Sequence, residues 1–406
     1  MMITTAKSGA LGDIAARVER GERLCLEDGV RLFASREIHE IGRLANIVRD
    51  RLHGDAAYYN INRHINYSNY CVLRCKFCSF YRPYPKGGVD SVPDSARASH
   101  GSVPLAVYES NEADAYELTV EHIAELARRA GEAGATEVHI VGGLHPTLPF
   151  SYYTDMCRAI RRVCPAIHIK AFTAIEIIHF TRISKPRLSI LQVLEQLREA
   201  GLDSLPGGGA EIFDDRIHEE AYRAKVGEQG WFDVHRAAHE LGIPSNATML
   251  YGHIETCEGR VVHMLKVRRH QDESLRSRRA AFNCFIPLSF IPDGSEFGHL
   301  PGPTGLDDLK TLAISRLMLD NVAHIKAFWI MQSAKLAQVS LNWGVDDIDG
   351  TVVSYDITKR EGGPGRRHQE MTVEQMRRLI IEAGRRPVER DTLYRPVVNH
   401  PNVGCV

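Results

Sequence analysis

Short β-like runs alternate with helix-like stretches along most of this 406-residue chain, and this alternation constrains the fold more than any other feature. Several helical stretches end at a glycine suited to a left-handed cap, as at Gly134 and Gly201. Eight strands with intervening helices predict an α/β fold of the (βα)8 TIM-barrel type. The predicted strands are Ile61–Tyr67, Glu137–Val141, Ile167–Phe172, Asp203–Leu205, Pro244–Met249, Asn283–Phe290, His324–Ile330 and Ile348–Val353.

The chain divides into three predicted parts. We expect an N-terminal helical extension at 1–58, the barrel at 59–358, and a C-terminal linker, helix and tail at 359–406. Two polar stretches, 82–115 and 268–279, are predicted to be surface loops because they interrupt the alternation. The expected helices are Thr119–Ala133, Tyr152–Val163, Ile190–Ala200, Trp231–Leu241, Arg260–His270, Leu306–Asn321, Ala334–Asn342 and Val373–Ala383.

Charge and composition limit the partners. The formal net charge is −1, so no overall field favours nucleic acid or an anionic membrane. No segment approaches the roughly 20 apolar residues that span a bilayer, and residues 1–24 offer no signal peptide. Nine cysteines are too few for a disulfide scaffold of this size. We therefore expect a cytoplasmic protein whose cysteines are metal ligands or buried thiols.

One side of several predicted strands is polar, although barrels usually fill their interior with Val, Ile and Leu. Unpartnered polar groups there would cost a few kcal/mol each. We therefore expect this side to surround a polar ligand; the alternative is that some of these groups face outward or pair with each other. The residues are Asn62, His64, Asn66, His139, His168, Lys170, Asn246, Thr248, His324 and Lys326.

Three cysteines, Cys71, Cys75 and Cys78, follow the first predicted strand. Thiolates at this spacing can converge on one iron–sulfur cluster, and three ligands instead of four leave one iron open to another molecule. A structural zinc site is the main alternative, but it usually needs four ligands arranged as Cys-x2-Cys pairs, and the sequence has no second pair. The pattern Cys-x3-Cys-x-Phe-Cys is that of the radical S-adenosylmethionine (SAM) superfamily.

Beyond the cysteines, the span from about Cys25 to Val353 resembles the aminofutalosine synthase (aminodeoxyfutalosine synthase) family of the futalosine route to menaquinone. Related cyclases and deazaflavin-forming synthases share the cysteines and the glycine-rich block, so the distinction depends on Asn246–Tyr251 and Gly143–Pro146. Residues 82–115 and 275–279 look like insertions relative to this family. The matching segments are Asn62–Tyr67, Gly142–Pro146, Lys170–Glu176, Leu205–Phe213, Asn246–Thr256 and Ser315–Asn321.

The resemblance implies roles for particular residues. It implies that a 4Fe-4S cluster is held by Cys71, Cys75 and Cys78, and that SAM is contacted by Phe77, Gly142, Gly143, Asn246 and Thr248. The catalytic candidates are Glu211, His145 and Lys170. For the glycines a plain turn is the alternative, for Glu211 a structural ion pair, and for Asn246 and Thr248 a supporting position. His64, His145, Lys170, His324 and Lys326 are candidates to face the substrate carboxylates.

The reaction implied by the resemblance consumes SAM as a co-substrate. The 5′-deoxyadenosyl radical would add to the vinyl carbon of 3-[(1-carboxyvinyl)oxy]benzoate, and rearrangement and decarboxylation would give 6-amino-6-deoxyfutalosine. An external donor such as flavodoxin or ferredoxin would supply the electron. Two alternatives stay open: an enzyme like the cyclic dehypoxanthine futalosine cyclase, and a barrel that binds a structural metal without catalysis.

Overall fold

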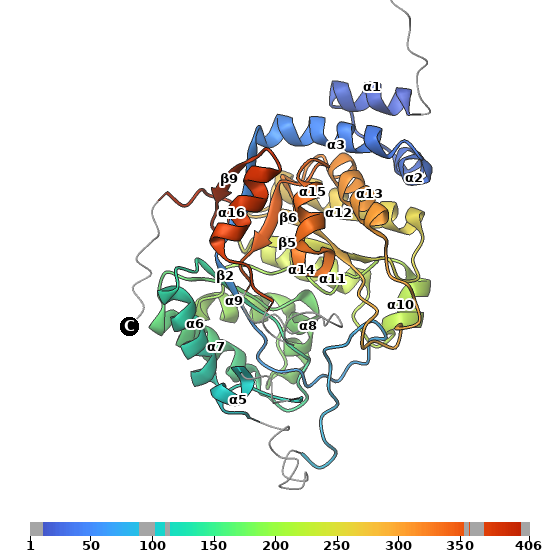
Figure 1. Cartoon of the computed structure of the whole chain (residues 1–406). Coiled ribbons are helices and arrows are strands. Elements are labelled where there is room, and N and C mark those ends of the chain that lie inside the picture. The colour runs from blue at the N-terminus through green and yellow to red at the C-terminus, as the bar shows by residue number, and fades with distance from the viewer. Residues whose placement is uncertain (1–10, 89–101, 110–113, 353–356, 358–368, 399–406) are drawn as a thin grey trace, which may run out of the picture.

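The computed structural model describes residues 11–88, 102–109, 114–352, 357 and 369–398 (Figure 1). Its helices are α1 (Gly12–Arg20), α2 (Leu26–Ala34), α3 (Ile38–His53), α5 (Leu105–Glu109), α6 (Val120–Glu132), α7 (Phe150–Val163), α8 (Ala174–Ile183), α9 (Ile190–Ala200), α10 (Asp215–Tyr222), α11 (Glu228–Glu240), α12 (Cys257–Ser277), α13 (Gly305–Met318), α14 (Trp329–Gln332), α15 (Ala334–Ser340) and α16 (Val373–Glu382). Its strands are β1 (Ala56–Asn60), β2 (Asn62–Ile65), β3 (Glu137–Ile140), β4 (His168–Ala171), β5 (Ser245–Tyr251), β6 (Phe282–Ser289), β7 (His324–Ile325), β8 (Asp347–Gly350) and β9 (Arg386–Glu389).

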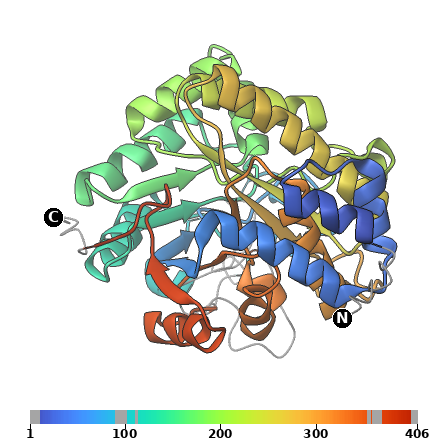
Figure 2. The same ribbon diagram turned by 90° about the horizontal axis from the view of Figure 1, so that it is seen from above.

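The strands form a closed parallel ring inside the helices, as the predicted (βα)8 barrel requires (Figure 2). Strands β2, β3 and β4 pair in parallel, and so do β5, β6 and β7. Bridges from Ser204 to Lys170 and from Leu205 to Ser245 join these two groups, and another bridge joins the chain after β7 to β8. Because β8 pairs with β1, which continues into β2, the ring closes.

Two predicted strands differ most from the observed ones. The fourth, Asp203–Leu205, forms isolated bridges and no continuous strand. The seventh was expected to reach Ile330, but β7 ends at Ile325 and α14 begins at Trp329. Apolar residues continue through this segment, so strand alternation alone does not mark where the chain turns into a helix.

The arginine-rich stretch 268–279, predicted to be a surface loop, is mostly the last part of α12, which ends at Ser277. Arg268 explains the difference, because its guanidinium donates to the carbonyl oxygens of Leu24 and Met318, each at 3.0 Å. These tertiary contacts stabilise a helix that the charge pattern alone does not favour. Residues 89–101 and 110–113 of the predicted insertion, and 358–368 around the predicted linker, lie outside the described residues.

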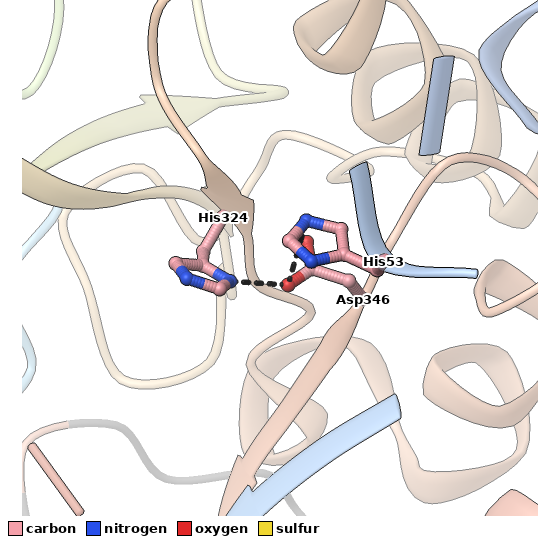
Figure 3. Close-up of side chains that lie close together, drawn as sticks. All are labelled: His53, His324 and Asp346. Atoms are coloured by element: carbon pink, nitrogen blue, oxygen red, sulfur yellow. Dashed lines mark hydrogen bonds and ion pairs between the residues drawn. The ribbon is translucent and has the colours of Figure 1, made fainter. Parts of the chain in front are cut away.

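Both ends of the described chain pack at the amino end of the barrel. α3 leads directly to β1, and β9 pairs in parallel with β1 from Ala56 to Tyr59. His324 of β7 lies 2.6 Å from Asp346, and His53 of α3 lies 3.6 Å from the same carboxylate (Figure 3). These contacts attach the N-terminal helices to the strands β7 and β8. No helix in the described part of the chain is both long and apolar enough to cross a membrane.

Arg316 of α13 is a fully buried cation at this end of the barrel. Its guanidinium contacts Asp346 and donates to the carbonyl oxygens of Gly344 and Ala323, each at 2.8 Å. Both Arg316 and Asp346 are fully buried, and a buried charge that loses its partner destabilises the folded state strongly. This pair therefore holds α13 against the segment that precedes β8.

We predict that Arg316→Met lowers the free energy of unfolding by about 3 kcal/mol or more, because it leaves Asp346 buried without its cation. Urea unfolding of the anaerobically purified protein measures the effect. Arg378→Met is the matched control, since the pair of Arg378 with Glu382 is exposed and should leave the urea midpoint nearly unchanged. Equal midpoints for the two variants would contradict the prediction.

Candidate active site

A single cavity inside the barrel collects most of the predicted site residues. It holds about 1100 Å³ of space not filled by protein atoms, part of it open to solvent. Its wall is largely apolar, with side chains such as Leu288, Phe328 and Met331. The predicted residues that line it are His64, Phe77, Cys78, His139, Lys170, Glu211, Asn246, Thr248 and Lys326.

The pairing register explains why the polar side chains of the strands meet. His64 of β2 is opposite His139 of β3, which is opposite Lys170 of β4, so the three lie in one layer facing the cavity. The expected inward orientation is thus confirmed for this layer. His168 and His324 do not line the cavity, because they lie one layer lower at the starts of β4 and β7.

The lower-layer residues bond within the barrel wall. His168 Nε2 lies 2.8 Å from the hydroxyl of Ser204, and Asn62 accepts a hydrogen bond from the amide of Val352 at 2.8 Å. Asn66, above them, donates to the carbonyl of Val141 at 2.9 Å. His324, at the start of β7, lies 2.6 Å from Asp346. The expectation that His324 faces the substrate therefore does not fit the structure.

His64 and His139 stack with ring centroids 4.3 Å apart and an interplanar angle of 13°. Burial lowers the pKa of His64 to about 4 and the pKa of His139 well below its usual value. Both rings are therefore neutral at pH 7. A neutral imidazole offers one donor and one acceptor, so the pair can hydrogen-bond a ligand without adding charge.

At this end of the cavity, six charged side chains, Lys170 of the layer among them, form what we call the floor: Glu137, Lys170, Lys326, Asp347, Asp349 and Arg390. Lys170 Nζ lies 2.7 Å from Glu137 Oε2, and Lys326 is paired with Asp349. Burial alone would raise the pKa of Glu137, but the charges of Lys170 and Arg390 outweigh it and hold that pKa well below its usual value. Lys326 likewise lowers the pKa of Asp349, so Glu137 and Asp349 each stay ionised beside a lysine.

The cysteine loop lies at the opposite end of the cavity, where Cys78 joins the lining. Cys71 Sγ accepts hydrogen bonds from the amides of Leu73 at 3.4 Å and Leu144 at 3.3 Å, which suits a thiolate ligand. Burial raises the pKa of the Cys75 thiol to about 12, so its thiolate needs a strong positive partner such as iron. As whole residues, all three cysteines are partly exposed.

The spacing of the three sulfur atoms argues against a single zinc ion. Tetrahedral Zn–S bonds of about 2.3 Å place sulfur ligands under about 4 Å apart. Among the described residues, the one group of potential metal ligands whose atoms all lie within 4.8 Å of each other is His53, His324 and Asp346, and not the cysteines. That group is held by hydrogen bonds instead, because His53 Nε2 lies 2.8 Å from the carbonyl of Ala323 and Arg316 contacts Asp346.

Gly142 and Gly143 allow the loop after β3 to lie against the cysteine loop. A Cβ at Gly143 would lie 2.2 Å from the carbonyl oxygen of Tyr70, and one at Gly142 would lie 2.5 Å from the Tyr67 ring. The amide of Val72 donates to the carbonyl of Leu144 at 3.0 Å and completes the contact. Neither glycine lines the cavity, so their observed neighbours are the cysteine loop and its support.

His145 does not line the cavity. Its Nδ1 accepts from the amides of Thr147 and Leu148, and its Nε2 lies 2.8 Å from Glu117. The ring also packs edge-on against Tyr70, next to Cys71. A catalytic contact with substrate therefore does not fit this placement, which suits a residue that holds the loop beside the cluster cysteines.

Glu211 lies on the cavity wall in a left-handed backbone conformation, with φ 46°, directly after the glycine-rich block. Its carboxylate pairs with Lys225, whose ammonium lies 5.3 Å from the centroid of the Phe77 ring. Lys225 is not among the site residues predicted from the sequence, because it follows α10 in a segment without a motif. The pair brings one negative and one positive group to the end of the cavity nearest the cysteines.

Comparison with known proteins agrees with this geometry. Residues 65–266 match the radical SAM superfamily, and residues 279–402 match the CofH/MqnC C-terminal region. Two solved structures share the fold. Methylornithine synthase has a TM-score of 0.66 at 18% identity over 92% of this chain and 97% of that chain. The FeFe-hydrogenase maturase HydG from Carboxydothermus hydrogenoformans has a TM-score of 0.65 at 16% identity over 97% and 82%. The barrel with its three-cysteine loop is therefore that of a radical SAM enzyme.

Closer relatives narrow this class. The chain is 43% identical to aminodeoxyfutalosine synthase of Thermus thermophilus over 95% of both chains, and 39% identical to that of Streptomyces coelicolor over 95% of this chain and 94% of the relative. A 5-amino-6-(D-ribitylamino)uracil–L-tyrosine 4-hydroxyphenyl transferase of Methanopyrus kandleri is 34% identical over 88% and 89%. The chain belongs to the aminodeoxyfutalosine synthase family.

We predict that Gly143→Ala loses most of its bound iron while keeping its helical content, because the new Cβ displaces the Tyr70 carbonyl that precedes Cys71. Iron and sulfide analysis and circular dichroism measure the two effects. Gly227→Ala is the control, since a Cβ there has no neighbour within 4 Å and its φ is an ordinary −74°. Full iron content in Gly143→Ala would show that the two loops can separate without loss of the cluster.

Proposed function

We propose that this enzyme joins the 5′-deoxyadenosyl group of SAM to 3-[(1-carboxyvinyl)oxy]benzoate, with rearrangement and loss of carbon dioxide, to form 6-amino-6-deoxyfutalosine for menaquinone synthesis. A 4Fe-4S cluster on Cys71, Cys75 and Cys78 supplies, when bound, the electron that cleaves SAM. The family of the chain supports this reaction. The structural observation that supports this reaction most directly is that one cavity runs from Cys78 to the lysines of the floor.

The lining of the cavity suits two ligands, because Phe77 and Cys78 lie at one end of it and Lys170 and Lys326 at the other. A ligand at the cysteine end and another at the floor would therefore lie next to each other inside the barrel. Such proximity is what a step that joins two molecules requires.

We assign the cysteine end of the cavity to SAM. Phe77 offers a ring for stacking against the adenine, and Glu211 offers a carboxylate acceptor for the ribose hydroxyls. Asn246 and Thr248 lie on the same wall, and Thr248 donates to the carbonyl of Gly207 at 3.1 Å. Gly142 and Gly143 fit an indirect part here, since they let the loop after β3 reach the cysteine loop.

We assign the floor end to the aromatic substrate, which carries two carboxylates. Lys170 and Lys326 both face the cavity and are the cations nearest to a ligand there. The neutral His64 and His139 rings lie in the same layer as Lys170 and can donate hydrogen bonds to a carboxylate. The apolar walls above them would hold the arene and keep water and other hydrogen donors away from a reactive carbon.

The electron for SAM cleavage would come from an external donor such as flavodoxin or ferredoxin. We place the reaction in the cytoplasm, where such donors and reduced thiols occur.

The proposal is tested by one anaerobic turnover with adenosyl-labelled SAM, dithionite and the enol ether. We expect label in a product that has lost carbon dioxide, with one SAM consumed per turnover, because the adenosyl group is incorporated. Mass spectrometry and label counting measure both. Label found only in free 5′-deoxyadenosine would favour the cyclase-like alternative, and a colourless protein with bound zinc would favour the metal-binding barrel.

The cluster is tested in the same preparation. We expect the wild-type protein to be brown and to contain about four irons per chain. Because thiolates hold the iron, Cys71→Ala, Cys75→Ala and Cys78→Ala should each lose both the iron and the ability to cleave SAM. Cys284→Ala is the control, because this buried cysteine of β6 should keep both iron and activity. Full SAM cleavage in any of the first three variants would contradict the assignment.

The role of Lys170 is tested with two variants, one that removes its charge alone and one that also removes the charge of Glu137. Lys170→Met should raise the KM for the enol ether by roughly ten- to a hundredfold, since a hydrogen bond to a charged group is worth about 1.5–3 kcal/mol. It also leaves Glu137 buried without its cation, so we compare it with the double variant Glu137→Gln/Lys170→Met, which removes both charges. We expect the double variant to regain stability and not affinity. If the double variant has the KM of the wild type, Lys170 does not bind the substrate.

A further inference from the structure

The C-terminal segment that follows β9 enters the amino end of the barrel. β9 pairs with β1, and the amide of Arg390 donates to the carbonyl of Tyr59 at 2.9 Å, which continues this pairing by one residue. Arg390 is fully buried, and Thr392 is 2% exposed. A tail that only covered the surface would leave such polar side chains in solvent. Here they point into the barrel.

Thr392 contacts the same carboxylate oxygen that holds Lys170. Its hydroxyl donates to Glu137 Oε2 at 2.6 Å, and Lys170 Nζ lies 2.7 Å from that atom. The hydroxyl therefore helps to fix the rotamer of Glu137, and Glu137 in turn fixes the ammonium group of Lys170. Since Lys170 lines the cavity, the position of its charge depends on a residue of the C-terminal segment.

Arg390 acts on the other lysine. Its Nε donates to Asp347 Oδ2 at 2.9 Å, while Asp347 Oδ1 accepts from the amide of Asp349, the partner of Lys326. Arg390 also lies 4.4 Å over the ring of Tyr394, which stacks on His324 with centroids 3.5 Å apart. The guanidinium is thus held on both sides.

The balance of charge gives Arg390 a second effect. The floor contains three carboxylates, from Glu137, Asp347 and Asp349, and its cavity-facing cations are Lys170 and Lys326. Without Arg390 these five groups would carry a net charge of −1 and would repel an anionic ligand. With Arg390 the floor is neutral as a whole, so the two lysines can attract anions.

We propose that Arg390 and Thr392 are positioning residues of the active site, and that the C-terminal segment determines whether the cavity accepts a dicarboxylate. They act through Asp347 and Glu137 and do not touch the ligand themselves. The proposal deepens the proposed function and rests on it for the identity of the substrate. Its physical content, the attraction of an aromatic dicarboxylate to the floor, can be measured separately.

Thr392→Val is the decisive variant, because valine has nearly the same shape but cannot donate to Glu137. We expect the KM for the enol ether to rise roughly tenfold, while the KM for SAM, the iron content and the thermal midpoint stay as in the wild type. Thr392→Ser should restore the KM, since it returns the hydroxyl. Thr154→Val, at a buried threonine of α7 that donates to the carbonyl of Ser151, is the matched control.

Calorimetric titration with benzene-1,3-dicarboxylate separates the two proposals, because this unreactive dianion reports the floor alone. Weaker binding to Thr392→Val and Arg390→Met than to the wild type supports the inference even if the enol ether proves not to be a substrate. The inference is overturned if the wild type does not bind the dianion, if Thr392→Val binds it equally well, or if Thr392→Val raises both KM values and lowers the thermal midpoint together. Product analysis of the wild type decides the proposed function independently.

Discussion

Charge pairing inside the barrel is the constraint on which the rest of the structure depends. Moving an ion out of water costs several kcal/mol unless a partner and further hydrogen bonds compensate it. This barrel buries three carboxylates and three cations at the floor of its cavity. Their partners come from β3, β4, β8, the chain after β7 and the C-terminal segment, so these five parts of the chain must come together before all of the charges are compensated. The same arrangement leaves two lysines facing the cavity.

Much of this architecture could be predicted from local pattern. The alternation of strands and helices predicts the barrel, and the period-two polar pattern predicts that His64, Lys170 and Asn246 face inward, as they do. Both signals depend on neighbouring residues only. The cysteine spacing is equally local, because three ligands within eight residues must share one loop.

Depth along the barrel axis could not be predicted in this way. Alternation assigns a side chain to a face but not to a layer, and therefore His168 and His324 were expected beside the ligand although they lie at the starts of their strands. The expected catalytic contact of His145 does not fit the structure for a related reason, since His145 follows the strand end and turns toward Glu117. The anionic partners Glu137 and Asp347 carried no motif, and Arg390 lies 43 positions beyond Asp347 in a predicted tail.

The bond from Thr392 to Glu137 joins residues 255 positions apart, so the cavity floor is completed by a contact of long sequence separation. Contacts between distant residues form late in folding, because the chain must first accept the entropy loss of closing a long loop. During synthesis the cysteine loop and β3 emerge from the ribosome long before residue 392. The cysteine loop can therefore form while the floor of the cavity still lacks Arg390 and Thr392, and under the role proposed for these two residues the enzyme accepts its substrate only after β9 has docked.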